Sequence, residues 1–201
     1  MKSRLLYAAL GALALTTPVT AQTNPTVYGS VVFGHEWEDM EAPPYGLYSM
    51  PADNGNAIKL EVRNDAIKAN GGGVYVDGMY HLVDFTRYEF EQVVTFRTFD
   101  TKNNWKLINE QTIKSYSSAA SDLTYDPVGD KIYGCFKETA TSTQYFLGTL
   151  NPITGFASKI ADIDEELIVL ASTRDGKLYG VGAYGMLYSV DKLTGKLTKI
   201  G

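Results

Sequence analysis

The chain has 201 residues, of which 44% are hydrophobic and 20% are charged, so it can form a packed core and is not a disordered tail. Its net charge of −5 argues against a dedicated nucleic-acid binder, because such proteins gather cations against phosphates. The 19 glycines and 14 tyrosines indicate many turns and many strands.

The first 21 residues have the pattern of a secretory signal peptide. Lys2 and Arg4 precede an apolar run from Leu5 to Leu15, which is shorter than the roughly 20 residues that span a bilayer. A plausible cleavage site follows and ends at Ala21. We expect cleavage near Ala21 and export to the periplasm, cell surface or extracellular space. A buried N-terminal helix is the alternative.

The mature domain predicted over residues 22–201 contains one cysteine, Cys135. The sequence therefore predicts no internal disulfide and no lipid anchor at a cysteine beside the cleavage site. We expect Cys135 to be a small buried residue of a strand, with a reactive thiol as the alternative. No later stretch is apolar and long enough to cross a membrane.

A tight turn followed by a strand recurs three times along the chain. Its copies are Asp77-Gly78-Met79-Tyr80, Gly129-Asp130-Lys131-Ile132-Tyr133-Gly134 and Asp175-Gly176-Lys177-Leu178-Tyr179-Gly180. Each copy follows an apolar segment. An Asp-Gly pair between apolar runs predicts a hairpin, because both turn positions tolerate positive φ.

A second motif follows each of these, in which a strand ends at Asp or Asn before another turn and strand. The strand ends are Asp100, Asn151 and Asp191, and Gly155 and Gly195 supply a left-handed turn position in the last two. A fourth copy lies between residues 45 and 60. The spacings between the three strand ends are 51 and 40 residues.

A period of about 40–50 residues with four strands per unit is typical of β-propeller blades. We therefore predict an all-β, propeller-like domain of about four blades, at roughly 26–63, 72–111, 122–162 and 167–201. The first blade offers three strands and lacks its innermost one. A β-sandwich or another barrel is the alternative.

Propellers usually close by pairing their two ends, and four blades are the low limit of their usual range. Here the last predicted strand is the outer strand of the fourth blade. We expect that the chain is an incomplete propeller, either the N-terminal part of a longer protein or an open arc with exposed faces. A closed four-bladed ring is the alternative.

The longer connections all fall on one predicted face of the propeller, at 34–44, 64–71, 85–92, 112–121 and 138–143. Long loops on a rigid scaffold favour a ligand site there. Simple drift in loop length is the alternative.

The loop from 35 to 41 is the richest in functional side chains. It could bind a hard cation, a sugar or a basic partner, through His35, Glu36, Trp37, Glu38 and Asp39. A solvated acidic loop is the alternative. This loop lacks the second histidine of the zinc helix motif.

The second candidate loop contains Arg87 and Tyr88, which are residue types enriched in binding hot spots. Packing of its aromatic rings on the blade below is the alternative. Tyr116 and Tyr184 are weaker candidates for ligand contact.

Other motifs lack the context that they need. The glycine pattern at 180–185 is followed by a predicted strand and not by the helix of a dinucleotide site. Only His35 and His81 occur, so a histidine-rich metal site is not expected, and His81 is predicted to be structural. We predict no catalytic residue, cofactor or metal ligand.

The N-terminal pattern, the stretch from Gly71 to Tyr80 and the Leu-Tyr-Gly and Asp-x-x-Thr-Gly repeats resemble a known kind of protein region. They are similar to the N-terminal propeller region of large secreted or surface proteins of Gram-negative bacteria. In those proteins, fibronectin type III or adhesin-like modules often follow. The resemblance implies an exported module with further C-terminal domains.

Two functions are consistent with this sequence. The first is a non-enzymatic extracellular module that binds a protein or a glycan. The second is a propeller enzyme, either a carbohydrate-active hydrolase or a quinoprotein-like oxidoreductase. The Asp175-Gly176 turn is similar to a sialidase Asp-box but has a different residue order. Quinoprotein propellers carry a tryptophan in most blades, whereas only Trp37 and Trp105 occur here.

Overall fold

The computed structural model describes residues 25–30, 43–67, 70–87, 92–138 and 143–201. Within these ranges the chain forms four antiparallel sheets, one of three strands and three of four. The first sheet contains β1 (Thr26–Ser30), β2 (Gly46–Pro51) and β3 (Lys59–Arg63). No helix among the described residues is both long and apolar enough to cross a membrane.

The other three sheets repeat one plan, in which four consecutive strands pair in chain order. The second contains β4 (Asn70–Val76), β5 (Met79–Arg87), β6 (Gln92–Asp100) and β7 (Lys106–Ile113). A short 3-10 helix, η1 (Tyr116–Ser118), leads to β8 (Ala120–Asp126), β9 (Lys131–Lys137), β10 (Tyr145–Leu150) and β11 (Ala157–Ile163). The fourth contains β12 (Leu167–Ser172), β13 (Leu178–Gly182), β14 (Leu187–Val190) and β15 (Leu197–Lys199).

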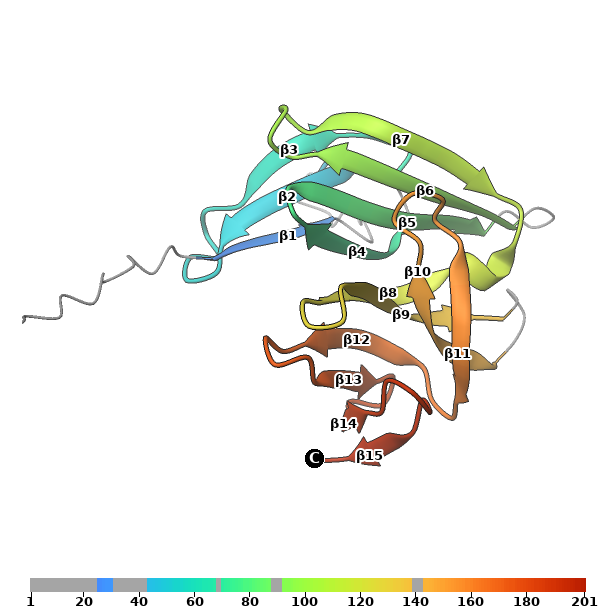
Figure 1. Cartoon of the computed structure of the whole chain (residues 1–201). Helices are drawn as coiled ribbons and strands as arrows, with labels where there is room; N and C mark the ends of the chain where they lie inside the picture. Colours follow the sequence, from blue (N-terminus) through green and yellow to red (C-terminus); the bar gives the residue numbers. More distant parts are fainter. Residues whose placement is uncertain (1–24, 31–42, 68–69, 88–91, 139–142) are drawn as a thin grey trace, which may run out of the picture.

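These sheets are the four blades of a β-propeller, which confirms the predicted fold. The first strands of successive blades pack together, β4 on β8 and β8 on β12. Figure 1 shows the blades following one another in chain order, with the first and the fourth at opposite ends. Among the described strands, no extensive packing joins these two end blades. The blades therefore form an open arc.

The first blade lacks its innermost strand among the described residues, as predicted. Its strand β1 occupies the position of a second strand. The contact of β1 with β4, the first strand of the next blade, is as small as the contact of β9, the second strand of the third blade, with β12. The sequence of β1 agrees with this position. It shares an aliphatic-Tyr-Gly triplet with the second strands of the third and fourth blades: Val27-Tyr28-Gly29, Ile132-Tyr133-Gly134 and Leu178-Tyr179-Gly180.

Each blade has a forward face, which meets the next blade, and a backward face, which meets the preceding one. Side chains alternate between these faces along every strand. On the forward faces of the second and third blades, the cross-strand pairs Val83–Phe96 and Cys135–Leu147 are fully buried. They lie in the apolar clusters that join the second blade to the third and the third to the fourth.

The backward faces supply the other half of each cluster. Their equivalent cross-strand pairs are Ile132–Leu150 in the third blade and Leu178–Val190 in the fourth. Burying a large aliphatic or aromatic side chain contributes roughly 1.5–3 kcal/mol, so these junctions are a principal source of stability. Cys135 belongs to one of them, as predicted, and burial raises the pKa of its thiol to about 12.

The turn chemistry predicted from the sequence is also present. Asp77 and Gly78 both have positive φ, 49° and 94°, in the turn between β4 and β5. Asn151 Oδ1 accepts the backbone N–H groups of Ile153 and Thr154 at 2.9 and 3.1 Å. Gly155 then takes φ 71°, the left-handed conformation that only glycine adopts without strain.

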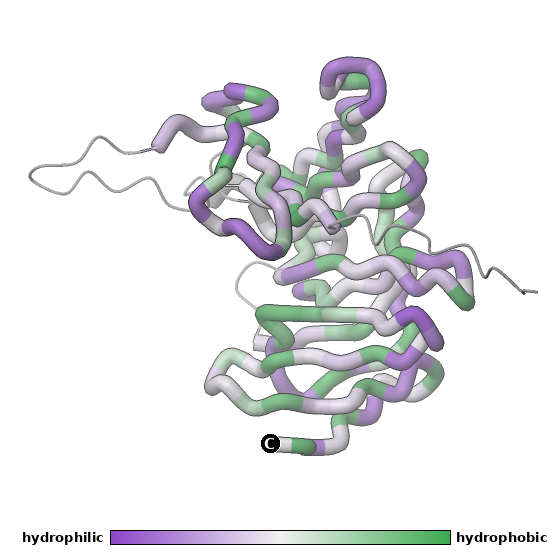
Figure 2. Tube along the Cα trace, turned by 90° about the vertical axis from the view of Figure 1, so that its left-hand side faces the viewer, coloured by the Kyte–Doolittle hydropathy of each residue, from purple (hydrophilic) through white to green (hydrophobic). Residues whose placement is uncertain are grey.

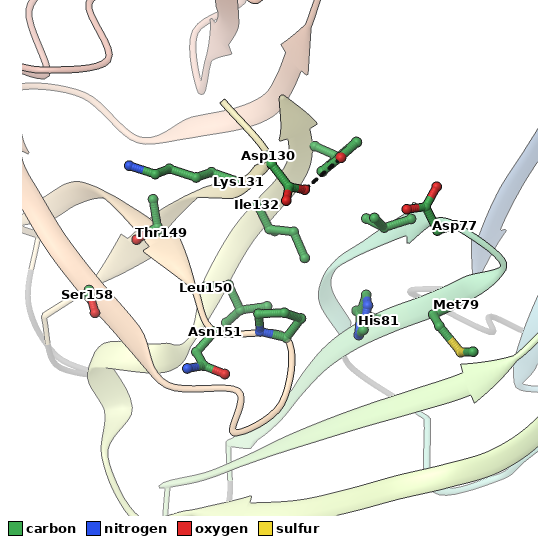
Figure 3. A pocket seen from close by; sticks show the side chains of 13 residues that line it. Asp77, Met79, His81, Asp130, Lys131, Ile132, Thr149, Leu150, Asn151 and Ser158 are labelled. Atoms are coloured by element: carbon green, nitrogen blue, oxygen red, sulfur yellow. Dashed lines mark hydrogen bonds between the residues drawn. The ribbon is translucent and has the colours of Figure 1, made fainter. Parts of the chain in front are cut away.

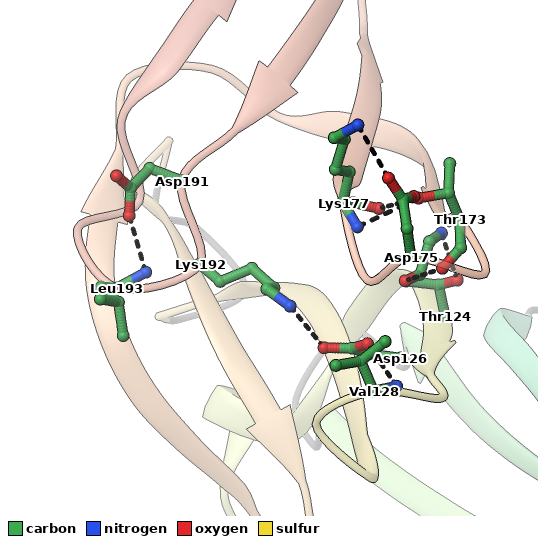
Figure 4. Close-up of polar contacts among 10 residues, drawn as sticks. Thr124, Asp126, Val128, Thr173, Asp175, Lys177, Asp191, Lys192 and Leu193 are labelled. Carbon is green, nitrogen blue, oxygen red and sulfur yellow. Dashed lines mark hydrogen bonds and ion pairs between the residues drawn. The ribbon is translucent and has the colours of Figure 1, made fainter.

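Polar contacts join the turns of neighbouring blades (Figure 4). Lys192, in the turn after β14, places its Nζ 2.6 Å from Oδ2 of the fully buried Asp126 at the end of β8. The other carboxylate oxygen of Asp126 accepts the backbone N–H of Val128 at 3.0 Å. In addition, Thr124 Oγ1 of the third blade accepts a hydrogen bond from the backbone N–H of Ser172 in the fourth blade at 3.0 Å. The third and fourth blades are thus held by hydrogen bonds as well as by apolar contact.

We predict that Gly155→Ala destabilises the protein more than Gly185→Ala does. Both glycines have positive φ, so alanine introduces about 1 kcal/mol of backbone strain at either position. At Gly155 the added Cβ also overlaps the Phe96 side chain of the second blade, whereas at Gly185 no atom lies within 4 Å. Urea denaturation should show a further loss of about 1–3 kcal/mol for Gly155→Ala. Equal losses would contradict the close packing of this turn on the second blade.

Candidate functional site

A cleft of about 440 Å³ lies between the second and third blades (Figure 3). We call it the interblade cleft. Its lining residues come from β4, β5 and all four strands of the third blade, with their turns: Val76, Asp77, Met79, His81, Tyr125, Asp130, Lys131, Ile132, Thr149, Leu150, Asn151, Pro152 and Ser158. This volume is within the range of small-molecule sites.

The cleft is at the edge where the short turns of the two blades meet. The turn between β4 and β5 supplies Asp77, the turn between β8 and β9 supplies Asp130, and the turn after β10 supplies Asn151 and Pro152. Loop length in the sequence predicts a ligand site on the opposite set of connections, which are longer. That placement stays a prediction, because much of those connections lies outside the described residues.

Two carboxylates from neighbouring blades face this cleft. Asp77 and Asp130 both have φ 49°, so each is fixed by a tight turn in a conformation that Asp and Asn tolerate better than most residues. The Tyr125 hydroxyl donates a hydrogen bond to Asp130 Oδ1 at 2.9 Å. Because this bond favours the neutral phenol, it raises the pKa of Tyr125. Lys131 adds one cation to the lining.

His81 lies deeper and is almost fully buried, at 6% exposure. Its Nδ1 is 3.1 Å from Thr98 Oγ1, and its ring stacks on Phe96 with centroids 5.9 Å apart and planes 7° apart. Burial lowers the pKa of His81 to about 4, so the ring is neutral at pH 7. The predicted structural role of His81 is confirmed, and its ring also lines the cleft.

The remaining lining is mixed in character. Val76, Met79, Ile132, Leu150 and Pro152 form an apolar part, whereas Thr149, Asn151 and Ser158 add hydroxyl and amide groups. An apolar surface with a few fixed polar groups is the usual composition of a small-molecule site. Within the described parts of the chain, no group of three or more His, Cys, Asp or Glu residues could hold a metal ion.

The predicted site residues lie elsewhere. His35, Glu36, Trp37, Glu38, Asp39 and Tyr88 are outside the described residues. Arg87 ends β5 and Tyr116 begins η1, and for both only the backbone is described. Tyr184, in the turn after β13, is 88% exposed and does not line the cleft.

The sequence identifies the cleft residues only as turn and strand formers. Its pattern places Asp77 and Asp130 in hairpins and Asn151 at a strand end. The signal that could have identified them is the recurrence of acidic turns in consecutive blades, since equivalent turns of a propeller lie on one face. That the turns of Asp77 and Asp130 lie on one cleft between the second and third blades is evident only from the three-dimensional structure.

Comparisons with known proteins concern the fold alone. No protein-family model and no curated protein matches the chain. Solved structures that resemble it include an oligogalacturonate lyase in complex with manganese, with 12% identity, a TM-score of 0.49 and coverage of 78% of this chain and 42% of the lyase. The β-propeller domain of the Trilobed protease from Pyrococcus furiosus has 15% identity and a TM-score of 0.43 over 65% of this chain and 42% of that one.

A third similar structure is an acylaminoacyl peptidase in complex with a chloromethyl ketone, with 12% identity and a TM-score of 0.42. The match covers 65% of this chain and 24% of the peptidase. The chain thus spans less than half the length of each of these three structures.

We predict that His81 makes the protein less stable in acid. As the pH falls from 6.5 towards 4, the unfolded chain takes up a proton on this histidine before the folded protein does, so the free energy of unfolding falls. The expected slope is about 1.4 kcal/mol per pH unit, or roughly 3 kcal/mol over the whole interval.

Urea denaturation of the wild type and His81→Phe at several pH values between 4 and 7.5 measures this effect. The stability of the wild type minus that of the variant should rise with pH. Burial raises the pKa of Asp122 to about 6, which gives a slope of opposite sign, but this contribution is common to both proteins and cancels in the difference. A difference that does not vary with pH would contradict the buried neutral imidazole.

Proposed function

We propose that this protein is a non-enzymatic binding module that holds a hydroxyl-rich ligand of saccharide type in the interblade cleft. The observation that carries the proposal is the pair of turn carboxylates, Asp77 and Asp130, on either side of a cleft with an apolar wall. A saccharide presents hydroxyl groups beside apolar C–H faces. The lining offers a matching combination of polar and apolar groups.

The carboxylates supply the directional part of this recognition. A carboxylate accepts hydrogen bonds from hydroxyl groups, and charge-assisted bonds of this kind are stronger than neutral ones. The Asn151 side chain can donate through its amide nitrogen, because its oxygen already accepts two backbone N–H groups, and Thr149 and Ser158 add hydroxyl groups. The tight turns fix the backbone of Asp77 and Asp130, and the Tyr125 hydrogen bond orients the Asp130 carboxylate, which lowers the entropy cost of binding.

Export is part of the same proposal. The signal-peptide pattern in residues 1–21 and the resemblance to propeller regions of bacterial surface proteins support a location in the periplasm, at the cell surface or outside the cell. Saccharides of the envelope or of a host would be available there. Further C-terminal modules stay a prediction from the resemblance.

We predict that Asp77→Asn and Asp130→Asn each weaken saccharide binding at least tenfold. Asparagine tolerates the left-handed conformation of these turns and still accepts the Tyr125 hydrogen bond, so the change removes charge with little effect on the fold. A glycan array with the wild-type chain identifies a bound saccharide, and calorimetry measures its affinity for each variant.

Asp175→Asn is the matched control, because Asp175 lies in the equivalent turn of the fourth blade and does not line the cleft. This variant should bind as the wild type does. The proposal fails if no glycan binds, or if the two cleft variants retain wild-type affinity. Turnover of a bound glycan that is lost in Asp77→Asn or Asp130→Asn would instead support the carbohydrate-active enzyme.

A further inference from the structure

The two ends of the arc carry apolar faces that no described residue covers. On the forward face of the fourth blade, Val169 is 47% exposed, and Val181, Leu187 and Ile200 lie beside it on the adjoining strands. Figure 2 shows hydrophobic stretches along the strands of this last blade, and no other described segment lies beyond it. On the backward face of the first blade, Val27 is 42% exposed.

The forward face of the fourth blade has the same register as the forward faces that are buried inside the arc. Val181 pairs with Leu187 across β13 and β14, just as Val83 pairs with Phe96 and Cys135 pairs with Leu147. Those two inner pairs are fully buried by the following blade. The Val181–Leu187 pair therefore occupies the position that, in the inner blades, packs against the backward face of the next blade.

The backward face of the first blade is the matching surface. Val27 pairs with Met50, in the position that Leu178–Val190 and Ile132–Leu150 occupy in the fourth and third blades. The two inner pairs pack against a forward face. The first blade instead has an open apolar hollow of about 300 Å³, whose lining includes Val27, Gly29, Tyr48, Met50 and Ile58.

We propose that the forward face of the fourth blade docks onto the backward face of the first blade of a second copy of this chain. At the second and third strands the junction repeats the one seen twice inside the arc, with Val181–Leu187 against Val27–Met50. The two surfaces lie at opposite ends of one chain, so a ring of two chains is the smallest closed assembly that covers both. The contact is head-to-tail, and a twofold axis relates its two occurrences in a closed ring of two chains.

A second copy is favoured because this chain itself contains both halves of the junction. Contiguous exposed apolar patches on a folded protein often mark interaction surfaces. The proposal does not depend on the ligand of the interblade cleft.

Light scattering coupled to size exclusion measures the mass of the full chain, and we expect a dimer for the wild type. Leu187→Asp and Met50→Asp each place a carboxylate in both junctions of the ring, so each variant alone should be a monomer. Leu193→Asp is the matched control, because Leu193 is 86% exposed in the turn after β14 and lies off the sheet face. It should remain a dimer.

A mixture of Leu187→Asp and Met50→Asp distinguishes head-to-tail docking from other contacts. A heterodimer of the two retains one junction in which both faces are unmodified, so the mixture should form dimers that neither variant forms alone. Circular dichroism establishes that each variant is folded. A monomeric wild type at high micromolar concentration would overturn the proposal, as would a Met50→Asp variant that remains a dimer, since that result points to contact between two fourth blades.

Discussion

The packing of a forward face on a backward face is the interaction on which this structure depends. Each blade is a twisted sheet too small to bury its apolar side chains alone, and two such faces together exclude water. The pairs Val83–Phe96 and Cys135–Leu147 are fully buried for this reason. Turn contacts such as that of Lys192 with the buried Asp126 then fix how neighbouring blades are aligned.

The interblade cleft and the apolar end faces are two consequences of this arrangement. Near the short turns of the second and third blades, the space between the two sheets is lined by Asp77, Asp130 and the buried His81. At the ends of the arc the same faces have no partner among the described residues. The fold therefore positions a candidate ligand site at an inner junction and a candidate docking surface at each end.

Much of this architecture could be predicted from the sequence, because the repeat is local. The Asp-Gly turn at 77–78 and the left-handed Gly155 and Gly195 follow from residue type, and together they define the blade period. The position of β1 as a second strand was also predictable. The cleft was not, because Asp77 and Asp130 are 53 residues apart and come together only through the packing of two blades. The loop candidates between 35 and 39 lie outside the described residues and stay predictions.

The packing of a forward face on a backward face is tested most directly by a double-mutant cycle between Tyr28 of the first blade and Tyr80 of the second. Their ring centroids are 6.2 Å apart with the planes at 60°, and this contact exists only if β1 presents Tyr28 forward. Tyr28→Leu and Tyr80→Leu, alone and combined, should show a coupling free energy of about 0.5–1.5 kcal/mol in urea denaturation. Additive effects would contradict the account, because a one-residue slip of β1 would turn Tyr28 away from the second blade.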